Sequence, residues 1–450
     1  MFTAINLFIF LILLLWIYSI YFTDKKKFRI VKYNEGEYYL LSRNMYFVIF
    51  TVCTAPIFLG TLSFIKYGLW IVVLLFLLFS NRLRFQMDMA MVAYLVFFCW
   101  LGVSMTYTTK PYDGFMMLVK YALPLLFLYL GYSALNSEKD LVIFLKVVNA
   151  AACIYIIFIG GFGQRVLTWF YYTVGFSVFG MYAAFANFTT SVFIVPIILY
   201  WLTKDKKYIY CALWMLASTV LLSVRTGLGG MMLVFAFAMF LRFKSRSLPG
   251  LIFAAIVFVG VLLYVPSVNE KFFGEDSEVT ATDIVQGDAL SMENMNTNGR
   301  EDTWEIILDK FYKGHEWRGS GLGVAIRFQK NKWLFDGGAG LIHNDYVQLL
   351  AETGIIGVGL LVLFYVLVVI KVMNYVVVQR SGYMVRLTGI MALSSMAGIA
   401  FSMYFDNVVS LSMQAMVIPY IYLGFFLKAV DMEKMKREQE KLNRFQHAVQ

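Results

Sequence analysis

The sequence has few charged residues, few histidines and few cysteines, and these shortages narrow what the protein can be. Of its 450 residues, 15% are charged, well below the roughly 25% of an ordinary soluble domain. Hydrophobic residues make up 60%, and the mean hydropathy is +0.70. The apolar runs are long and continuous rather than alternating, which favours membrane-spanning helices over a barrel. We therefore predict an all-α polytopic membrane protein.

The four cysteines, Cys53, Cys99, Cys153 and Cys211, lie within or beside apolar runs, so neither a disulfide framework nor a zinc site is indicated. The long polar stretch before residue 344 lacks the P-loop, HExxH and DxD patterns that hydrolysis or phosphoryl transfer would need. We expect no metal and no cofactor. The sequence shows no repeat of fixed period. It also shows no pair of matched halves with broken helices, a feature that would favour a secondary transporter.

The apolar runs predict about 12 to 13 membrane spans. They lie at residues 4–22, 44–62, 63–80, 89–106, 115–134, 141–161, 180–202, 208–224, 227–241, 248–265, 354–373, 387–404 and 408–428. The first run has no basic leader and no small-residue cleavage site, so we expect it to be retained as the first span.

The formal net charge is +10, and the distribution of the basic residues indicates membrane topology rather than a nucleic-acid-binding patch. Residues 266–343 carry 13 acidic and 8 basic side chains, a net charge of −5, so the rest of the chain carries +15. That positive charge lies in alternate short loops and at the C-terminus, which the positive-inside rule assigns to the cytoplasm. We predict an N-terminal bundle of about ten spans at 1–265, an extracytoplasmic loop at 266–353, C-terminal spans at 354–428 and a cytoplasmic tail at 429–450.

A short amphipathic helix is predicted inside the loop. Its apolar positions follow the spacing i, i+3, i+4, i+7 and are Trp304, Ile307, Leu308 and Phe311. We expect this helix to lie on the membrane surface and to end at Gly314, with Trp304 among the headgroups. Arg300 would be in its first turn, where free backbone N–H groups also favour anions.

The GSGLG stretch from Gly319 to Gly323 predicts a turn that can pass close to a ligand. A flexible loop with no ligand is the commoner explanation of such a pattern. A dinucleotide site is excluded, because the stretch has no parallel-sheet context.

Two arginines fall at the predicted outer ends of spans, against the charge bias. Arg165 lies in GFGQRVLTW, and Arg225 lies in a short turn, SVRTGLGG, whose glycines allow close approach. An arginine at a span end can simply extend its side chain to the membrane interface. For a single arginine this explanation has the same weight as a functional role.

His343 comes directly before Asn344 and a predicted helix. A single histidine is more often structural than catalytic. At a helix N-terminus and near arginines, however, we expect its imidazole to be neutral and able to accept a proton. Such a base among fixed cations suits attack by a sugar hydroxyl on a donor whose leaving group is a diphosphate.

Together these motifs resemble the O-antigen polymerase and O-antigen ligase superfamily of bacterial membrane glycosyltransferases. The resemblance covers roughly residues 180–405. It rests on SVRTG, GREDTW, GSGLG and, most specifically, HNDYVQLLAETGIIG. The chain departs from the family at Ser223-Val224-Arg225, where the serine usually stands directly before the arginine.

The resemblance implies a C-type glycosyltransferase architecture in the bacterial cytoplasmic (inner) membrane. Such an enzyme moves a glycan from undecaprenyl diphosphate to a second acceptor on the outer face, without a nucleotide sugar or an obligatory metal. It implies that Arg225 and Arg300 stabilise the diphosphate and that His343 orients or deprotonates the acceptor hydroxyl. The residues that we further expect to contact substrate are Arg165, Trp304, Gly321, Gly323 and Asn344.

Our first hypothesis is an inverting, metal-independent polysaccharide polymerase. Its expected partners are a lipid-linked glycan as donor, a polysaccharide as acceptor and the surrounding membrane lipid. A ligase that transfers finished polymer to a lipid or protein acceptor stays open, as does a non-catalytic assembly subunit. A transporter of lipid-linked sugars is the alternative of another class, with a polar pathway through Lys120, Lys146, Glu352 and Asp406. A chain-length regulator is a further candidate partner, and nucleic acid is not.

Overall fold

The structure is a computed structural model that describes thirteen parts of the chain. These are residues 30–33, 38–41, 88–135, 137–150, 152–153, 182–221, 224–265, 268–269, 273, 300–326, 342–379, 381–411 and 413–449. Within them the chain is helical apart from loops and one hairpin. In that hairpin β1 (Ile30–Tyr33) pairs antiparallel with β2 (Tyr38–Leu41), with Ile30 opposite Leu41.

The described residues confirm an all-α polytopic membrane protein. Six helical segments among them are long and apolar enough to cross a membrane: Pro111–Ser133, Phe185–Thr203, Arg225–Tyr264, Asp345–Val378, Tyr383–Phe405 and Ala415–Gln446. Two shorter apolar helices are α4 (Met89–Met105) and α9 (Lys207–Leu221).

Most predicted spans correspond to helices of the structure. The helices concerned are α4, α5 (Pro111–Ala134), α7 (Tyr182–Val192), α8 (Ile194–Thr203), α9, α10 (Arg225–Phe243), α11 (Leu248–Tyr264), α16 (Asp345–Met373), α17 (Tyr383–Phe405) and α19 (Met413–Val449). A 3-10 turn, η3 (Lys244–Ser247), joins α10 to α11, and a π-helical turn, η5 (Asn374–Val378), follows α16. The predicted spans 4–22, 44–62 and 63–80 lie outside the described residues, and 141–161 does so in part.

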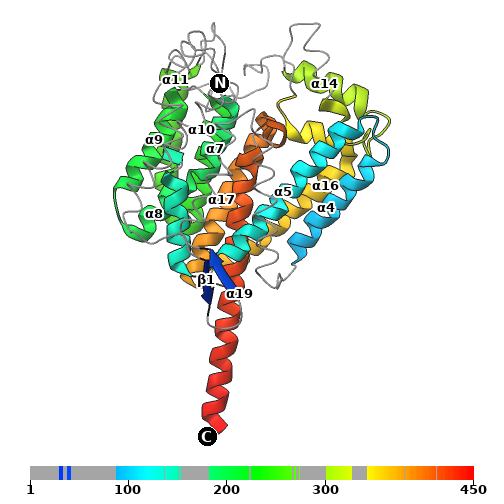
Figure 1. The fold of residues 1–450 in the computed structure, drawn as a ribbon. Helices are drawn as coiled ribbons and strands as arrows, with labels where there is room; N and C mark the ends of the chain where they lie inside the picture. The colour runs from blue at the N-terminus through cyan, green and yellow to red at the C-terminus, as the bar shows by residue number, and fades with distance from the viewer. Residues whose placement is uncertain are drawn as a thin grey trace, which may run out of the picture.

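Four helix pairs organise the bundle. α5 and α17 both pack along α19, α10 packs along α17, and α16 packs along α4 (Figure 1). Gly131 and Gly424 allow α5 and α19 to approach so closely that an added Cβ on either would meet the backbone of the other helix. Small residues bring membrane helices together in this way, because dispersion contacts rather than water exclusion drive their association.

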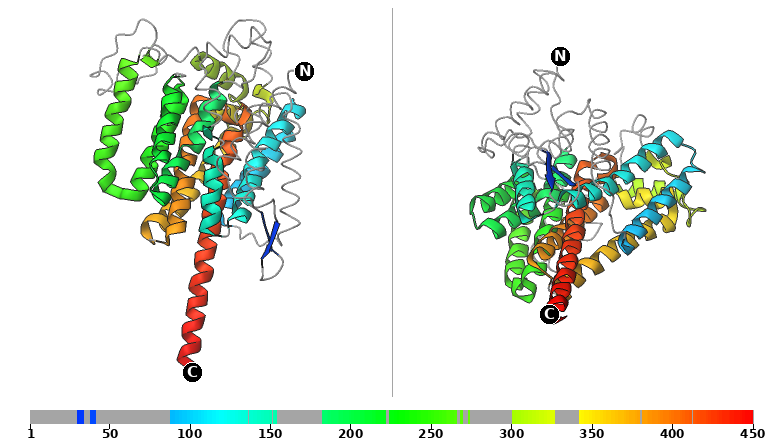
Figure 2. Two further views of the ribbon diagram at one scale, coloured as in Figure 1. Left: turned by 60° about the vertical axis from the view of Figure 1, so that its left-hand side comes forward. Right: turned by 60° about the horizontal axis from the view of Figure 1, so that its bottom comes forward.

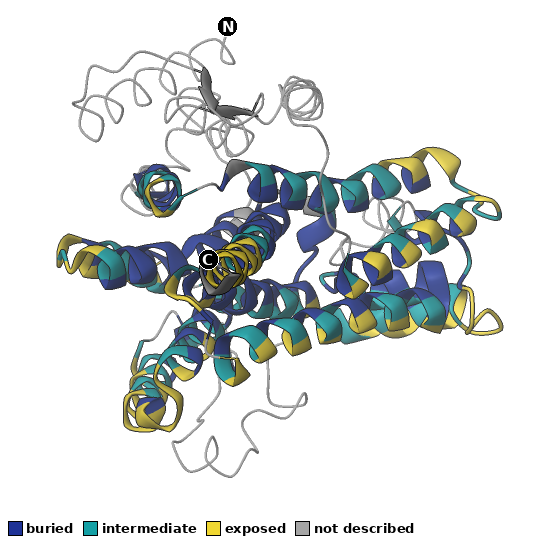
Figure 3. Ribbon diagram, turned by 90° about the horizontal axis from the view of Figure 1, so that it is seen from below, coloured by how far each residue is buried: buried dark blue, intermediate teal, exposed yellow. Residues whose placement is uncertain are grey.

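Asp88 helps to hold α4 against α16. Its carboxylate accepts a hydrogen bond from the Met91 amide at 2.9 Å, which caps α4, and it also pairs with Lys371 of α16. Among the spanning segments, burial is greatest in α7 and α8, in α19 and in α17, and exposed side chains lie mainly on the outward faces of the bundle (Figure 3).

α19 continues without a break from the bundle into the predicted tail. Figures 1 and 2 show its C-terminal part projecting away from the other helices as a single rod. The side chains of residues 434–446 on this rod are exposed. We call this end of the bundle the tail end and the opposite end, which carries α14 (Arg300–Phe311), the α14 end.

Candidate functional site

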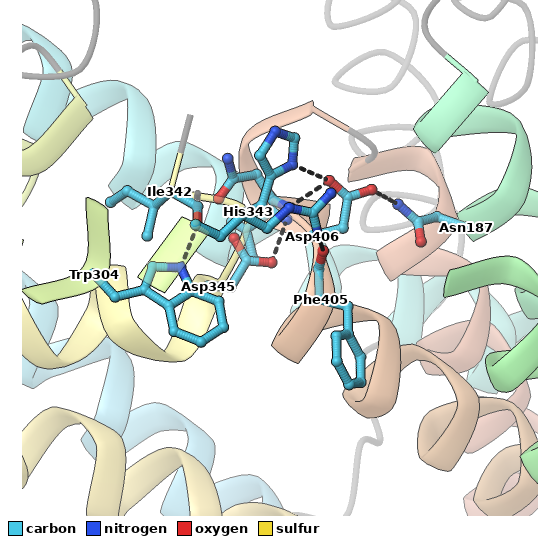
Figure 4. Close-up of polar contacts among 10 residues, drawn as sticks. Asn187, Trp304, Ile342, His343, Asp345, Phe405 and Asp406 are labelled. Atoms are coloured by element: carbon cyan, nitrogen blue, oxygen red, sulfur yellow. Dashed lines mark hydrogen bonds and ion pairs between the residues drawn. The ribbon is translucent and has the colours of Figure 1, made fainter. Parts of the chain in front are cut away.

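α14 forms because its apolar side chains fall on one face, as predicted, but that face packs on protein. Ile307 is fully buried in a cluster with Ala325, Ile342 and Ala351, and Trp304 packs against the same cluster. The Trp304 indole Nε1 donates a hydrogen bond to the Ile342 carbonyl at 2.5 Å (Figure 4). The helix therefore rests on α16 and the residues before it. Its place at the membrane surface stays a prediction.

α16 is interrupted near its first third. Gly354 has φ of +68° and ψ of −172°, a combination that glycine alone adopts readily, and it separates a short first part, 345–353, from the long second part. The break coincides with the position at which we predicted the extracytoplasmic loop to end. A break leaves backbone N–H and C=O groups without their helical partners, and inside a membrane these must be satisfied by other groups.

The segment 316–321, which we call the clasp, supplies these partners. The carbonyls of Glu316 and Trp317 accept hydrogen bonds from the amides of Ile355 and Ile356 at 2.9 and 3.3 Å. On the other side of the break, the Ser320 amide donates to the Ala351 carbonyl at 3.0 Å. The clasp thus fixes the direction in which the first part of α16 leaves the second.

The glycines of the GSGLG stretch are explained by packing at the clasp. Gly321 has φ of +105° and an added Cβ would lie 2.5 Å from Cα of Thr108. Gly323 has φ of +87°, and its Cα faces the backbone at Asp113 and Gly114. The predicted turn is present, but its close backbone approach is to the loop between α4 and α5 and to the first turn of α5. A substrate contact by Gly321 or Gly323 stays a prediction.

His343 stands directly before α16 with φ of +49°, in the left-handed region. Asn344 is the N-cap, and its side-chain oxygen accepts hydrogen bonds from the amides of Tyr346 and Val347, each at 3.0 Å. Because Asn344 is buried and engaged in this cap, its observed role is to start the helix that follows His343. A substrate contact by Asn344 also stays a prediction.

The His343 ring contacts Asp406, which the sequence presented only as part of a transport pathway. Nδ1 of His343 lies 3.2 Å from Oδ1 of Asp406, the residue that follows α17 (Figure 4). Asp406 is buried, and its other oxygen accepts a hydrogen bond from the Asn187 amide nitrogen of α7 at 2.9 Å. In the tautomer of a neutral His343 that donates from Nδ1 to Asp406, Nε2 has a free lone pair.

Arg300 and Arg225 converge on the same region from α14 and α10. Nη1 of Arg300 donates a hydrogen bond to the Phe405 carbonyl at 2.7 Å, one residue before Asp406. Arg225, the first residue of α10, lies close enough to Arg300 for the two cations to repel each other. Burial lowers the pKa of Arg300 from its ordinary value, and the nearby Asp406 charge opposes that shift. The two partly buried arginines therefore concentrate positive charge in one small region.

The structure therefore brings Arg225, Arg300 and His343 together, although 118 residues separate the first from the last. Trp304 lies beside them and forms an edge-to-face pair with Tyr404 at 6.0 Å between ring centroids. Arg165 lies outside the described residues. The sequence analysis did not predict Asp406 and Asn187 as site residues. The only sequence feature that could have indicated Asp406 is its position as an aspartate at the end of a predicted span.

Comparison with known proteins agrees with this grouping. Residues 210–364 match the model of the O-antigen ligase family. The matched stretch includes Arg225, Arg300 and His343 and confirms the resemblance to the O-antigen polymerase and ligase superfamily. No curated protein matches the chain.

Proposed function

We propose that the protein is a polysaccharide polymerase that joins undecaprenyl-diphosphate-linked oligosaccharide units. Catalysis takes place at the α14 end, which faces the outside of the bacterial cytoplasmic membrane, and the tail end faces the cytoplasm. The observation that carries the proposal is the grouping of two arginines and a carboxylate-bound histidine in one small region. The family match supports glycan transfer in general.

The arginines suit the donor side of this reaction. When the bond between the sugar C1 and the diphosphate oxygen breaks, negative charge grows on the diphosphate. Guanidinium groups stay protonated and bind phosphate oxygens in a bidentate way, so Arg225 and Arg300 would stabilise the leaving group. Their mutual repulsion in the free protein would be relieved by a bound diphosphate, which favours binding of that anion over a neutral glycan.

His343 suits the acceptor side. With Nδ1–H directed at Asp406, Nε2 can accept the proton of a sugar hydroxyl as its oxygen attacks C1. One glycosidic bond forms and one C1–O bond breaks in the same step, so a single displacement inverts the anomeric centre. The proton ends on His343, and the products are an extended glycan and undecaprenyl diphosphate. Asp406 would stabilise the imidazolium that forms.

Three of the four charged residues considered for a transporter, Lys120, Glu352 and Asp406, have hydrogen-bond partners within the fold. Lys120 donates a hydrogen bond to the Ser410 carbonyl at 2.7 Å, and Glu352 accepts one from the Ala325 amide at 3.3 Å. Asp406 is engaged by His343 and Asn187. These contacts favour an enzyme over a polar transport pathway. A ligase would use the same site chemistry, and only the identity of the acceptor would differ.

Glycan analysis of cells that lack the protein tests the proposal. Lipid-linked intermediates and surface polymer would be separated by gel and identified by mass spectrometry. We expect single repeat units to accumulate on undecaprenyl diphosphate and the polymer to disappear, with recovery when the wild-type chain is restored. Full-length polymer that stays on its lipid carrier would instead identify a ligase. Unchanged pools would contradict glycan transfer altogether.

A further inference from the structure

Asp406 lies in a short segment that is held in place by charged residues outside the proposed chemistry. After α17 ends at Phe405, the chain turns through Asp406 and Asn407 into the single-turn helix α18 (Val408–Leu411). This turn carries both the partner of His343 and, through the Phe405 carbonyl, the partner of Arg300. Whatever fixes this turn therefore fixes the direction of the histidine ring.

Asp345 holds the beginning of α18. It is two residues after His343 and only 2% exposed, and its Oδ2 accepts a hydrogen bond from the Val409 amide at 3.0 Å (Figure 4). An oxygen that accepts a hydrogen bond from one of the first amides of a helical turn satisfies a donor that has no partner inside the turn.

Lys120 of α5 holds the other end of α18. Its ammonium donates a hydrogen bond to the Ser410 carbonyl at 2.7 Å, and it lies within electrostatic reach of Asp345. Asp345 at the first amides and Lys120 at the last carbonyls therefore each bind a backbone group of α18 that has no partner within this short turn.

We propose that Asp345 and Lys120 are positioning residues that clamp α18 and thereby set the contact between Asp406 and His343. The inference deepens the proposed glycosyl transfer and rests on it. Asp345 and His343 lie at the same helix start, so the clamp ties the backbone of the base directly to the backbone of its carboxylate partner. Neither clamp residue touches the reacting atoms.

The test measures kinetics of the full-length protein in lipid nanodiscs. The donor probe is the lipid-linked oligosaccharide extracted from cells that lack the protein. We expect Asp345→Ala to lower kcat about 100-fold, because a small misplacement of a catalytic group has effects of this size. The KM for the donor should change less than about threefold, because the arginines are untouched. Asp345→Asn keeps an oxygen for the Val409 amide and should stay within about tenfold of wild type.

Lys120→Met provides an independent measurement if Asp345→Ala fails to accumulate in the membrane. It should lower kcat, and the double variant Asp345→Asn/Lys120→Met should lose less than the product of the two single effects, because both residues hold the same turn. Asp309→Asn, at an exposed position on α14, is the matched control and should match wild type.

Two results would overturn the clamp. One is an unchanged kcat per folded molecule in Asp345→Ala or Lys120→Met, which would reduce these residues to a stabilising role. The other is strictly multiplicative effects in the double variant. Failure of the proposed function is a separate result, because the wild-type protein would then release no undecaprenyl diphosphate from the donor probe.

Discussion

His343 combines a backbone conformation that few non-glycine residues adopt with a side chain aimed at a buried carboxylate. Such backbone strain costs on the order of 1–3 kcal/mol and persists where the surrounding structure imposes it. Here the Asn344 cap on one side and the Trp304 contact to Ile342 on the other fix the backbone on both sides of the histidine. The imidazole is therefore oriented before any substrate binds.

Substituting His343 and Asp406 together tests whether they act as one unit. We expect His343→Ala to lower kcat about 100-fold or more, because a general base contributes at least this much. The double variant His343→Ala/Asp406→Ala should be little worse than His343→Ala alone, because residues that act as a unit give non-additive losses. Initial rates of polymer formation provide the measurement.

The exposed His315 offers a matched control for this pair, and His315→Ala should match the wild-type rate. Independent losses that multiply in the double variant would show that Asp406 acts separately from the histidine.

The planar guanidinium of Arg300 is a second feature at this scale. Arg300→Lys keeps a positive charge but loses the bidentate geometry, so we expect a fall of about 100-fold in kcat/KM for the lipid-linked donor. Arg246→Lys, at an exposed position in η3, is the control and should behave as wild type. Wild-type kcat/KM in Arg300→Lys would mean that this arginine supplies only charge, or nothing, to the donor site.

The break in α16 is the decisive feature at the scale of elements. The sequence predicted a helix on each side of residue 354. The first follows Asn344, and the second is the apolar span that begins at residue 354. It did not predict that the clasp would supply the backbone partners of the break. These hydrogen bonds join residues more than 30 positions apart, and a backbone carbonyl carries no residue-specific signal.

Two glycines of α16 give a direct test of the break. Gly354→Ala should destabilise the protein by about 1–3 kcal/mol, because alanine is strained at a φ of +68° and its Cβ would meet the Trp317 carbonyl. Gly359→Ala, on the same helix, meets no atom within 4 Å and should be neutral or slightly stabilising. Thermal unfolding in detergent distinguishes the two.

Equal unfolding temperatures for the two alanine variants would show that α16 can close its break and run straight. The clasp would then be an accessory contact rather than the device that directs the start of α16 toward Asp406.

At the scale of the whole molecule, hydropathy and charge predicted the helices far better than the site. The spans follow from local apolar runs, and ten helices of the structure correspond to them. The partners of His343 and Arg300 come from residues 63 and 105 positions away, and no pattern in a single sequence fixes which span ends meet. Arg225, Arg300 and His343 were predicted because their motifs resemble a family, whereas Asp406 has no such motif.

The projecting rod of α19 contributes little to the packed bundle. Its last anchoring contact within the described residues is the Glu433 carboxylate, which accepts a hydrogen bond from the Gly382 amide at 2.8 Å. A chain that ends after residue 433 should therefore insert normally and form polymer at the wild-type rate. Quantitative immunoblotting of membranes and polymer gels would measure both. Loss of polymer with normal insertion would assign the rod a role in the reaction or in partner binding.

The most direct test of the whole account is the reaction of the purified protein with lipid-linked oligosaccharide extracted from cells that lack it. Mass spectrometry would follow both products over time. The account predicts one free undecaprenyl diphosphate for each new glycosidic bond in the dimers and longer glycans, with inverted anomeric configuration, and neither product from His343→Ala. Release of undecaprenyl diphosphate without glycan extension, or retention of the anomeric configuration, would contradict it.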